Sequence, residues 1–145
     1  MAVSSGGGHW VELRRIAPAL KGLDVFYANT DAGPDADLGQ VRHYRLRNVT
    51  RRNRLGFAVV IWQVLDILRR ERPQVVVTTG AAPGLVALVL AKIFLRSRTI
   101  WIDTIANSRE MTLSGRLARR FADAWLVQWP HLARPGGPEH WGAVL

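Results

Sequence analysis

The chain has 145 residues, of which 48% are hydrophobic and 21% charged, a composition that predicts one globular domain with its own core. It contains no cysteine, which excludes disulfides and thiolate metal sites, and its four histidines lack the close pairing of metal ligands, so we expect no metal. Twenty lysine and arginine residues against eleven acidic ones give a net charge of +9, which favours an anionic partner, although a base composition rich in arginine codons gives the same excess.

No apolar stretch is long enough to span a bilayer, which takes roughly 20 apolar residues. The longest, Leu85 to Leu95, is interrupted by Lys92. Because no basic segment precedes an apolar one at the start of the sequence, we expect no signal peptide and a cytoplasmic location.

The first predicted elements are a short strand over Ala2–Ser5 and an amphipathic helix over His9–Lys21, joined by three consecutive glycines. Glycine amides at a helix N-terminus form a site suited to an anion, usually a phosphate or diphosphate. His9 lies on the first turn, within reach of such an anion. The alternative is an ordinary strand-to-helix turn.

Apolar strands and helical patterns alternate along the rest of the chain, which predicts an α/β fold with a Rossmann-like parallel sheet and helices on both faces. The further strands are expected over Asp24–Ala28, Val41–Arg45, Gln74–Thr78, Thr99–Asp103 and Ala124–Val127. The further helices are expected over Leu55–Glu71, Gly84–Leu95 and Ser114–Ala122. Glycine, proline and Asp/Asn residues in Thr30–Gln40 predict a loop.

The helix over Leu55–Glu71 carries more apolar residues than one sheet contact needs. Its predicted core stripe is Phe57, Val60, Ile61, Val64 and Leu68, and its second apolar face is Leu55, Val59 and Trp62. Arginines crowd the preceding segment, a pattern typical of a helix that lies in a membrane interface. A core helix after a solvated basic loop is the alternative. The candidate membrane-contact residues are Arg51, Arg52, Arg54, Phe57 and Trp62.

A second glycine-rich turn follows the strand over Gln74–Thr78. Ligands of open parallel sheets bind beyond the carboxyl ends of the strands, so we expect the two turns to lie at one edge. Neither turn has the G-x-G-x-x-G spacing or a Walker lysine, so a dinucleotide cofactor is disfavoured and no cofactor is expected. The candidate acceptor- and phosphate-binding residues are Ser5, Gly6, Gly7, Gly8, Thr79 and Gly80.

Asp103 ends an apolar strand at the same predicted edge. A carboxylate there is suited to act as a base or to hold a sugar hydroxyl. It is equally suited to accept hydrogen bonds from the turn at Asn107 and Ser108. We therefore name His9 and Asp103 as candidate catalytic residues and leave both roles of Asp103 open.

Proline and glycine residues in Pro130–Pro138 predict the end of the domain, which we expect to cover residues 1–129. Residues 130–145 would then form a tail that docks a partner. Apolar residues in such a setting usually mark an interface, and the candidates are Trp129, Trp141 and Leu145. The alternative is that the tail folds back on its own domain.

Several segments together resemble one family. They are Ser4–His9, Thr78–Ala81, Ile102–Asp103, Ser114–Leu117, Ala122–Asp123 and Leu126–Trp129. In this order they look like the oligosaccharide-biosynthesis family, which includes the membrane-docking subunit of the eukaryotic dolichol-linked UDP-GlcNAc transferase and bacterial PssD-type proteins. The glycine loop with His9 also resembles that of MurG, the related lipid II glycosyltransferase.

The resemblance implies the N-terminal half of a GT-B glycosyltransferase that is split over two chains. This chain would bind a polyprenyl-diphosphate-linked sugar acceptor, peripherally on the anionic inner face of the cell membrane. A partner subunit, the C-terminal half, would bind the UDP-sugar donor, and this chain alone would be inactive. The eukaryotic members carry an N-terminal membrane anchor that we do not expect here.

The arginine excess supports a second hypothesis, a nucleic-acid-binding or other nucleotide-binding Rossmann-like domain. Because the arginines are scattered over several elements and no recognised binding module is present, no nucleic-acid partner is expected.

Overall fold

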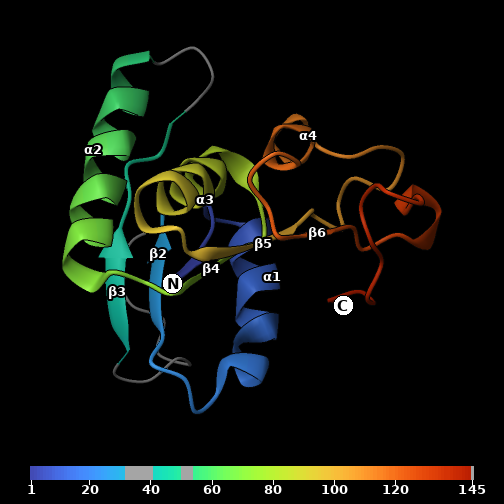
Figure 1. The fold of residues 1–145 in the computed structure, drawn as a ribbon, viewed down its shortest axis with the longest axis horizontal. Coiled ribbons are helices and arrows are strands. Elements are labelled where there is room, and N and C mark those ends of the chain that lie inside the picture. Colours follow the sequence, from blue (N-terminus) through green and yellow to red (C-terminus); the bar gives the residue numbers. More distant parts are fainter. Residues whose placement is uncertain (32–40, 50–53, 145) are drawn as a thin grey trace.

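The structure is a computed structural model that describes residues 1–31, 41–49 and 54–144, with only the backbone of Arg54. Within these residues, six parallel strands form one sheet in the order β3-β2-β1-β4-β5-β6 (Figure 1). The strands are β1 (Ala2–Val3), β2 (Phe26–Asn29), β3 (Arg42–Arg45), β4 (Val75–Thr78), β5 (Arg98–Ile102) and β6 (Ala124–Leu126). The helices are α1 (Gly8–Ile16), α2 (Arg54–Glu71), α3 (Ala81–Leu95) and α4 (Leu113–Ala118), with short 3-10 turns η1 (Ala17–Leu20) and η3 (Pro130–Leu132).

The predicted strands are all present, and the helices differ from prediction mainly at their ends. The first helix ends at Ile16 and continues as a 3-10 turn, with Pro18 in its first turn. Helix α3 begins at Ala81, three residues before the predicted start, and α4 ends at Ala118. Most of the predicted loop, residues 32–40, lies outside the described residues.

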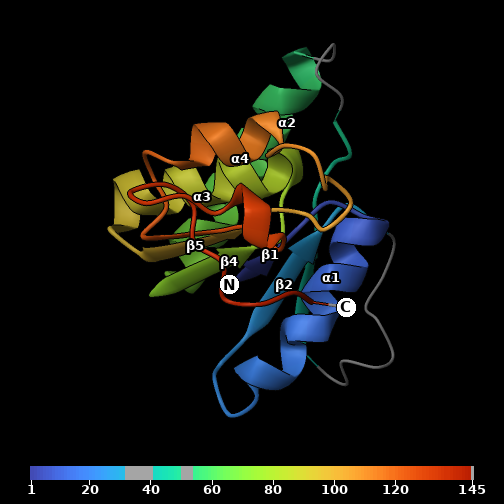
Figure 2. The ribbon, with the colours of Figure 1, turned by 90° about the vertical axis from the view of Figure 1, so that its right-hand side faces the viewer.

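Helices cover both faces of the sheet (Figure 2). On one face α1 packs Trp10 and Leu13 against a cluster that includes Tyr27 and Val77. On the other face α2, α3 and α4 lie side by side and enclose the larger part of the core. Val76 on β4 and Trp101 on β5 are fully buried, as is usual in central strands of a parallel sheet, whereas Val75 at the start of β4 is 43% exposed.

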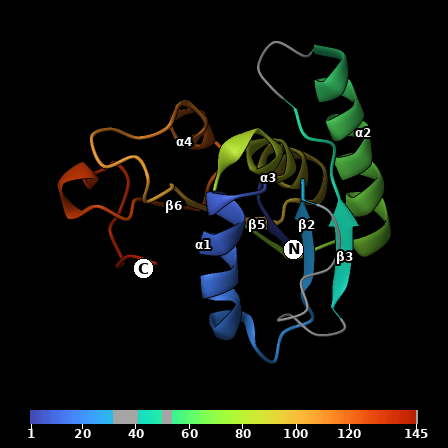
Figure 3. The same cartoon turned by 180° about the vertical axis from the view of Figure 1, so that it is seen from behind.

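The order of the strands places the candidate site. Strands β1, β2 and β3 follow one another toward one edge of the sheet. Strand β4 lies on the other side of β1, and β5 and β6 continue from it toward the opposite edge. The turns after β1 and β4 therefore adjoin at the carboxyl edge of the sheet, which is where open parallel sheets bind ligands. The first turns of α1 and α3 meet there (Figure 3).

Helix α2 confirms part of the predicted pattern. Val60, Val64 and Leu68 are buried against the sheet, but Phe57 is only half-buried. The prediction that Ile61 is a core residue is wrong: it is 39% exposed, at the edge of the buried stripe that contains Val64 and Leu68.

The second apolar face of α2 is exposed as predicted at two positions. Leu55 is 83% exposed and Trp62 is 68% exposed, whereas Val59 is half-buried. Of the basic candidates, Arg51 and Arg52 lie outside the described residues, and so does the side chain of Arg54.

The predicted tail returns to the sheet along much of its length. The amide of Val127 donates to the carbonyl of Glu139 at 2.9 Å, and the amide of Glu139 donates to the carbonyl of Trp125 at 2.9 Å, which places Glu139 beside β6. The indole of Trp129 donates to the carbonyl of Ile105 at 2.7 Å. These contacts favour the alternative in which this part of the tail folds back.

The end of the tail differs from its middle. The amide of Val144 donates to the Gln128 side chain at 2.8 Å, and the Val144 carbonyl accepts from Arg15 at 3.3 Å. Trp141 is nevertheless 68% exposed, and Leu145 lies outside the described residues.

Candidate functional site

His9 lies where the first turn of α1 meets the turn between β4 and α3. Its Nδ1 is 3.0 Å from the carbonyl oxygen of Thr79, and the Thr79 hydroxyl donates to the His9 carbonyl at 2.7 Å. A carbonyl oxygen only accepts hydrogen bonds, so Nδ1 carries the proton and Nε2 of the neutral ring holds the free lone pair. A histidine that accepts a proton on Nε2 needs this tautomer.

Gly80 provides the space for the His9 ring. A Cβ built on Gly80 would lie 3.1 Å from Cε1 of His9, and the φ of Gly80 is +123°, a conformation that other residues rarely adopt. The half-buried ring therefore lies directly against the N-terminus of α3, as well as on the first turn of α1.

The carboxylate of Asp31 lies at the glycine loop. The amide of Gly6 donates to the Thr30 hydroxyl at 2.8 Å, and the amide of Gly7 donates to the Asp31 carboxylate at 3.1 Å. A carboxylate at a helix N-terminus is stabilised by the helix dipole and the unpaired amides. The loop thus has the geometry expected of an anion site, with the side chain of Asp31 at one of its amides.

The other predicted phosphate-binding side chains are engaged inside the protein. Thr79 is fully buried: its hydroxyl donates to the backbone carbonyl of His9 and its own carbonyl holds Nδ1 of the imidazole, so it presents no hydroxyl to solvent. The Ser5 hydroxyl donates to the Gly6 carbonyl at 3.3 Å. The amides of Gly6 and Gly7 also have partners inside the protein, so the ring of His9 and the first turn of α1 at Gly8 are the groups that a ligand can meet directly.

Asp103 is buried, with 2% of its surface exposed. Its carboxylate accepts from the Trp101 indole at 3.1 Å, from the Thr112 amide at 2.8 Å and from the Thr112 hydroxyl at 2.5 Å. Thr112 in turn caps α4 by accepting from the amide of Gly115. These contacts favour the loop-acceptor alternative, at Thr112 instead of the predicted turn at Asn107 and Ser108.

Glu12 is a site residue that the sequence analysis missed. It is 5% exposed, and its carboxylate accepts from the Thr104 hydroxyl at 2.7 Å, the Ile105 amide at 3.2 Å and the Gln128 side chain at 3.3 Å. The signal was an acidic residue on the buried stripe of an amphipathic helix. Glu12 connects the helix that carries His9 to the ends of β5 and β6.

In the described part of the chain, no group of three or more His, Asp or Glu residues is arranged to hold a metal ion. None of the helices in the described segments is both long and apolar enough to cross a membrane.

Comparison with known proteins identifies the family of the chain. Residues 38–144 match the family described as "Oligosaccharide biosynthesis protein Alg14 like". The chain belongs to this family. The resemblance inferred from the sequence motifs is thereby confirmed at the level of the Alg14-like family.

Two curated relatives illustrate the match. The UDP-N-acetylglucosamine transferase subunit ALG14 of Eremothecium gossypii is 33% identical over 94 residues, which cover 57% of this chain and 42% of that protein. The subunit of the same name from Yarrowia lipolytica is 25% identical over 162 residues, covering 92% of this chain and 74% of that protein. The chain thus spans less than half of the first relative.

Solved structures show the same fold. MurG of Acinetobacter baumannii superposes with a TM-score of 0.71 at 13% identity, over 96% of this chain and 45% of MurG. The UDP-GlcNAc 2-epimerase of Methanocaldococcus jannaschii superposes with a TM-score of 0.58 at 14% identity, over 89% of this chain and 38% of the epimerase. At these identities the likeness concerns the fold, and it confirms the predicted Rossmann-like parallel sheet.

Proposed function

We propose that this Alg14-like chain is the acceptor-binding subunit of a split GT-B glycosyltransferase. In this proposal it binds a polyprenyl-diphosphate-linked sugar, and a donor-binding partner subunit supplies a UDP-sugar. Two facts support the proposal: the curated relatives carry the name of a UDP-N-acetylglucosamine transferase subunit, and the chain matches 45% of MurG. The observation that carries it is the His9 site, where an imidazole of defined tautomer faces two helix N-termini.

The acceptor diphosphate is assigned to the glycine loop. The amides of Gly6, Gly7 and Gly8 precede or begin α1, where the helix dipole and the amides of the first turn favour a phosphate. The amide of Gly6 donates to the Thr30 hydroxyl, so it binds the diphosphate only by exchanging that bond. The amide of Gly7 now donates to Asp31, so the diphosphate takes the place of that carboxylate. Gly80, at the N-terminus of α3, is assigned as the second contact, and its amide exchanges its present bond to the Thr78 hydroxyl, 3.1 Å long, for one to the ligand.

His9 is assigned as the general base. Its Nε2 accepts the proton of the acceptor hydroxyl while that oxygen attacks the anomeric carbon of the donor sugar. The bond between that carbon and the UDP oxygen breaks, UDP leaves with the electron pair, and the proton remains on Nε2. Asp103 and Glu12 touch neither reactant in this scheme and act as positioning residues that hold the ends of β5, β6 and the start of α4.

The chain is proposed to act as a peripheral protein on the inner face of the cell membrane. Leu55 and Trp62 on α2 present apolar surface, and the net charge of +9 favours anionic lipid. The end of the tail, where Trp141 is exposed, is assigned as the surface that binds the partner subunit. Trp129 is less available, since its indole bonds to Ile105.

Reconstitution tests the proposal. Transfer of GlcNAc from UDP-GlcNAc to a polyprenyl-diphosphate-linked sugar is measured with this chain alone, with the donor-binding subunit alone and with both. We expect turnover only when both are present, because each half supplies one side of the cleft. Full turnover by this chain alone would refute its role as one half of the enzyme.

Trp141→Ser is expected to weaken association of the two subunits without unfolding the chain, since Trp141 lies outside the core.

A further inference from the structure

A pocket lies at the β6 end of the molecule, and none of its lining residues belongs to the His9 site. It has a volume of about 490 Å³ and is enclosed by the loop before α4, by α4 with the start of β6, and by the segment after η3. Four arginines line it, namely Arg109, Arg116, Arg119 and Arg134. Its volume is within the range of about 300–1,000 Å³ that is typical of small-molecule sites.

The walls of this arginine pocket are fixed by hydrogen bonds between segments that are distant in sequence. The Trp125 indole donates to the carbonyl of Gly115 at 2.8 Å, and His131 is hydrogen-bonded to the carbonyl of Ser108 at 2.6 Å. The segment after η3 is closed by a bond from the Arg134 amide to the Pro138 carbonyl at 3.1 Å. The four arginines, all of them exposed, therefore line a cavity whose walls are joined by these hydrogen bonds.

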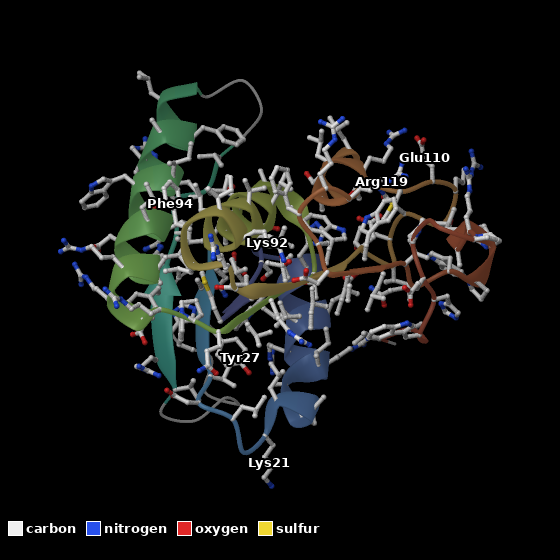
Figure 4. The ribbon with its side chains drawn as sticks, viewed as in Figure 1. Lys21, Tyr27, Lys92, Phe94, Glu110 and Arg119 are labelled. Carbon is white, nitrogen blue, oxygen red and sulfur yellow. The ribbon has the colours of Figure 1, made fainter. Side chains whose placement is uncertain are left out.

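The charge of the pocket is poorly balanced within the protein. Glu110 is the one acidic residue among its lining residues, and it lies beside α4, near Arg119 (Figure 4). Its carboxylate is 3.7 Å from the Arg116 guanidinium, with 73% and 57% of the two side chains exposed, so this ion pair is weak. The four arginine side chains are exposed, so solvent screens their mutual repulsion, and an anion that enters the pocket meets an excess of positive charge.

The chemistry of the lining indicates which anion fits. Guanidinium groups bind phosphate oxygens through paired hydrogen bonds, and several of them together suit a phosphate with two negative charges. Trp125 and Met111 add half-buried apolar surface to the same cavity, which suits an organic group attached to the phosphate. Leu113 and Leu117 on α4, which are 44% and 54% exposed, lie within two residues of pocket-lining residues in the sequence.

We propose that the arginine pocket binds the phosphate group of a phosphorylated organic ligand. The site is additional to the proposed acceptor site and does not depend on glycosyl transfer. A soluble phosphorylated metabolite and the headgroup of an anionic phospholipid share this chemistry, and the two sources are distinguished by experiment.

The first arm uses inorganic pyrophosphate and the full chain. The ¹H–¹⁵N signal of the Trp125 indole, assigned with Trp125→Phe, is followed during titration. We expect a saturable shift, and Arg119→Ala should weaken binding about tenfold, as expected for loss of a charge-assisted hydrogen bond. Arg120→Ala is the matched control, because Arg120 is exposed on the same helix end but does not line the pocket.

The second arm measures flotation of the same variants with phosphatidylcholine vesicles, with and without phosphatidylglycerol. If Arg119→Ala lowers flotation on the anionic vesicles and Arg120→Ala does not, the ligand is a lipid headgroup. If Arg119→Ala weakens only pyrophosphate binding, the ligand is soluble. Both outcomes support the pocket. The proposal is wrong if pyrophosphate gives no saturable shift and the Arg119→Ala and Arg120→Ala variants float alike. It is also wrong if pyrophosphate binds but the two variants bind it alike and float alike.

Discussion

His9 is held by a reciprocal pair of hydrogen bonds with Thr79. One bond fixes the tautomer of the imidazole, and the other ties the backbone of α1 to the turn between β4 and α3. Because the ring also lies against Gly80, its rotation is restricted by contacts on two sides. A catalytic group that is oriented before the substrate arrives loses little freedom in the transition state.

Replacing His9 is the test of its chemical role. In the assembled enzyme, His9→Ala should lower kcat by roughly 100-fold, the usual size of a general-base contribution. Thr79→Val is the companion variant, since it removes the hydroxyl bond to the His9 carbonyl but leaves the ring, and it should have a much smaller effect. An increase in the acceptor KM at unchanged kcat would show instead that His9 only binds the ligand.

Asp103 is expected to behave as a structural residue. Asp103→Ala removes the acceptor of one buried donor and two partly buried ones, so the free energy of unfolding should fall by about 1–3 kcal/mol, measured by urea denaturation. The kcat of the folded complex should fall less than in His9→Ala. Unchanged stability together with a loss of kcat as large as that of His9→Ala would make Asp103 the base.

The sequence indicated Asp103 and His9 by their positions after strands, but it did not distinguish their tasks. Whether a carboxylate at a strand end faces a ligand depends on its neighbours, and here Thr112, nine residues later, supplies two of its donors. Glu12 was missed for the same reason, because its partners lie 92 or more residues away in the chain.

Asp123 joins three elements near the start of β6. Its carboxylate accepts from Lys92 on α3 at 2.5 Å and from the amide and hydroxyl of Thr99 on β5 at 2.8 and 3.0 Å. The hydrogen bond from Lys92 is the largest cause that holds the pKa of Asp123 below its ordinary value of 3.8, and the two bonds from Thr99 act in the same direction. The ionised form therefore stabilises the fold.

The pH dependence of stability tests this assignment. Since the folded-state pKa of Asp123 is lowered, its stabilising effect is complete above the ordinary value of 3.8 and is lost as the pH falls through the lowered value. Because the Asp123 side chain is 44% exposed and solvent screens its ion pair with Lys92, Asp123→Asn should reduce the free energy of unfolding at pH 7 by at most about 1 kcal/mol. In denaturant titrations the difference from the unchanged chain should shrink in acid below the ordinary pKa. A difference that stays constant into acid would contradict the role of the carboxylate charge.

The elements themselves were largely predictable, because apolar runs and helical periodicity report burial directly. The start of α3 was not, since Gly80 and Pro83 both signal a turn. A proline is tolerated in the first turn of a helix, where its missing amide has no partner to lose, and α3 therefore begins at Ala81. The pairing of Glu139 with β6 carries no periodic signal, so the return of the tail was only an alternative.

The molecule as a whole presents apolar side chains on the face that α2, α3 and α4 cover. Leu55 and Trp62 on α2 are joined there by Ile93 and Phe94 at the end of α3, which are 57% and 64% exposed. With a net charge of +9, such a surface suits an anionic membrane.

Flotation on anionic vesicles tests this surface. Trp62→Ser should lower the bound fraction because it removes an exposed aromatic side chain, and added salt should lower it further by screening the arginines. Val11→Ser is a suitable control, since Val11 is 45% exposed on α1, which covers the opposite face of the sheet. Equal loss of binding in both variants, or binding indifferent to salt, would argue against this face.

The central claim is that this chain binds the acceptor and its partner binds the donor. The most direct measurement is equilibrium binding of the isolated chain to a short-chain polyprenyl-diphosphate-linked sugar and, separately, to UDP-GlcNAc. The account predicts saturable binding of the first, tightened by Asp31→Asn because the competing charge at Gly7 is removed, and no binding of the second. Saturable binding of UDP-GlcNAc without binding of the polyprenyl-linked sugar would contradict it.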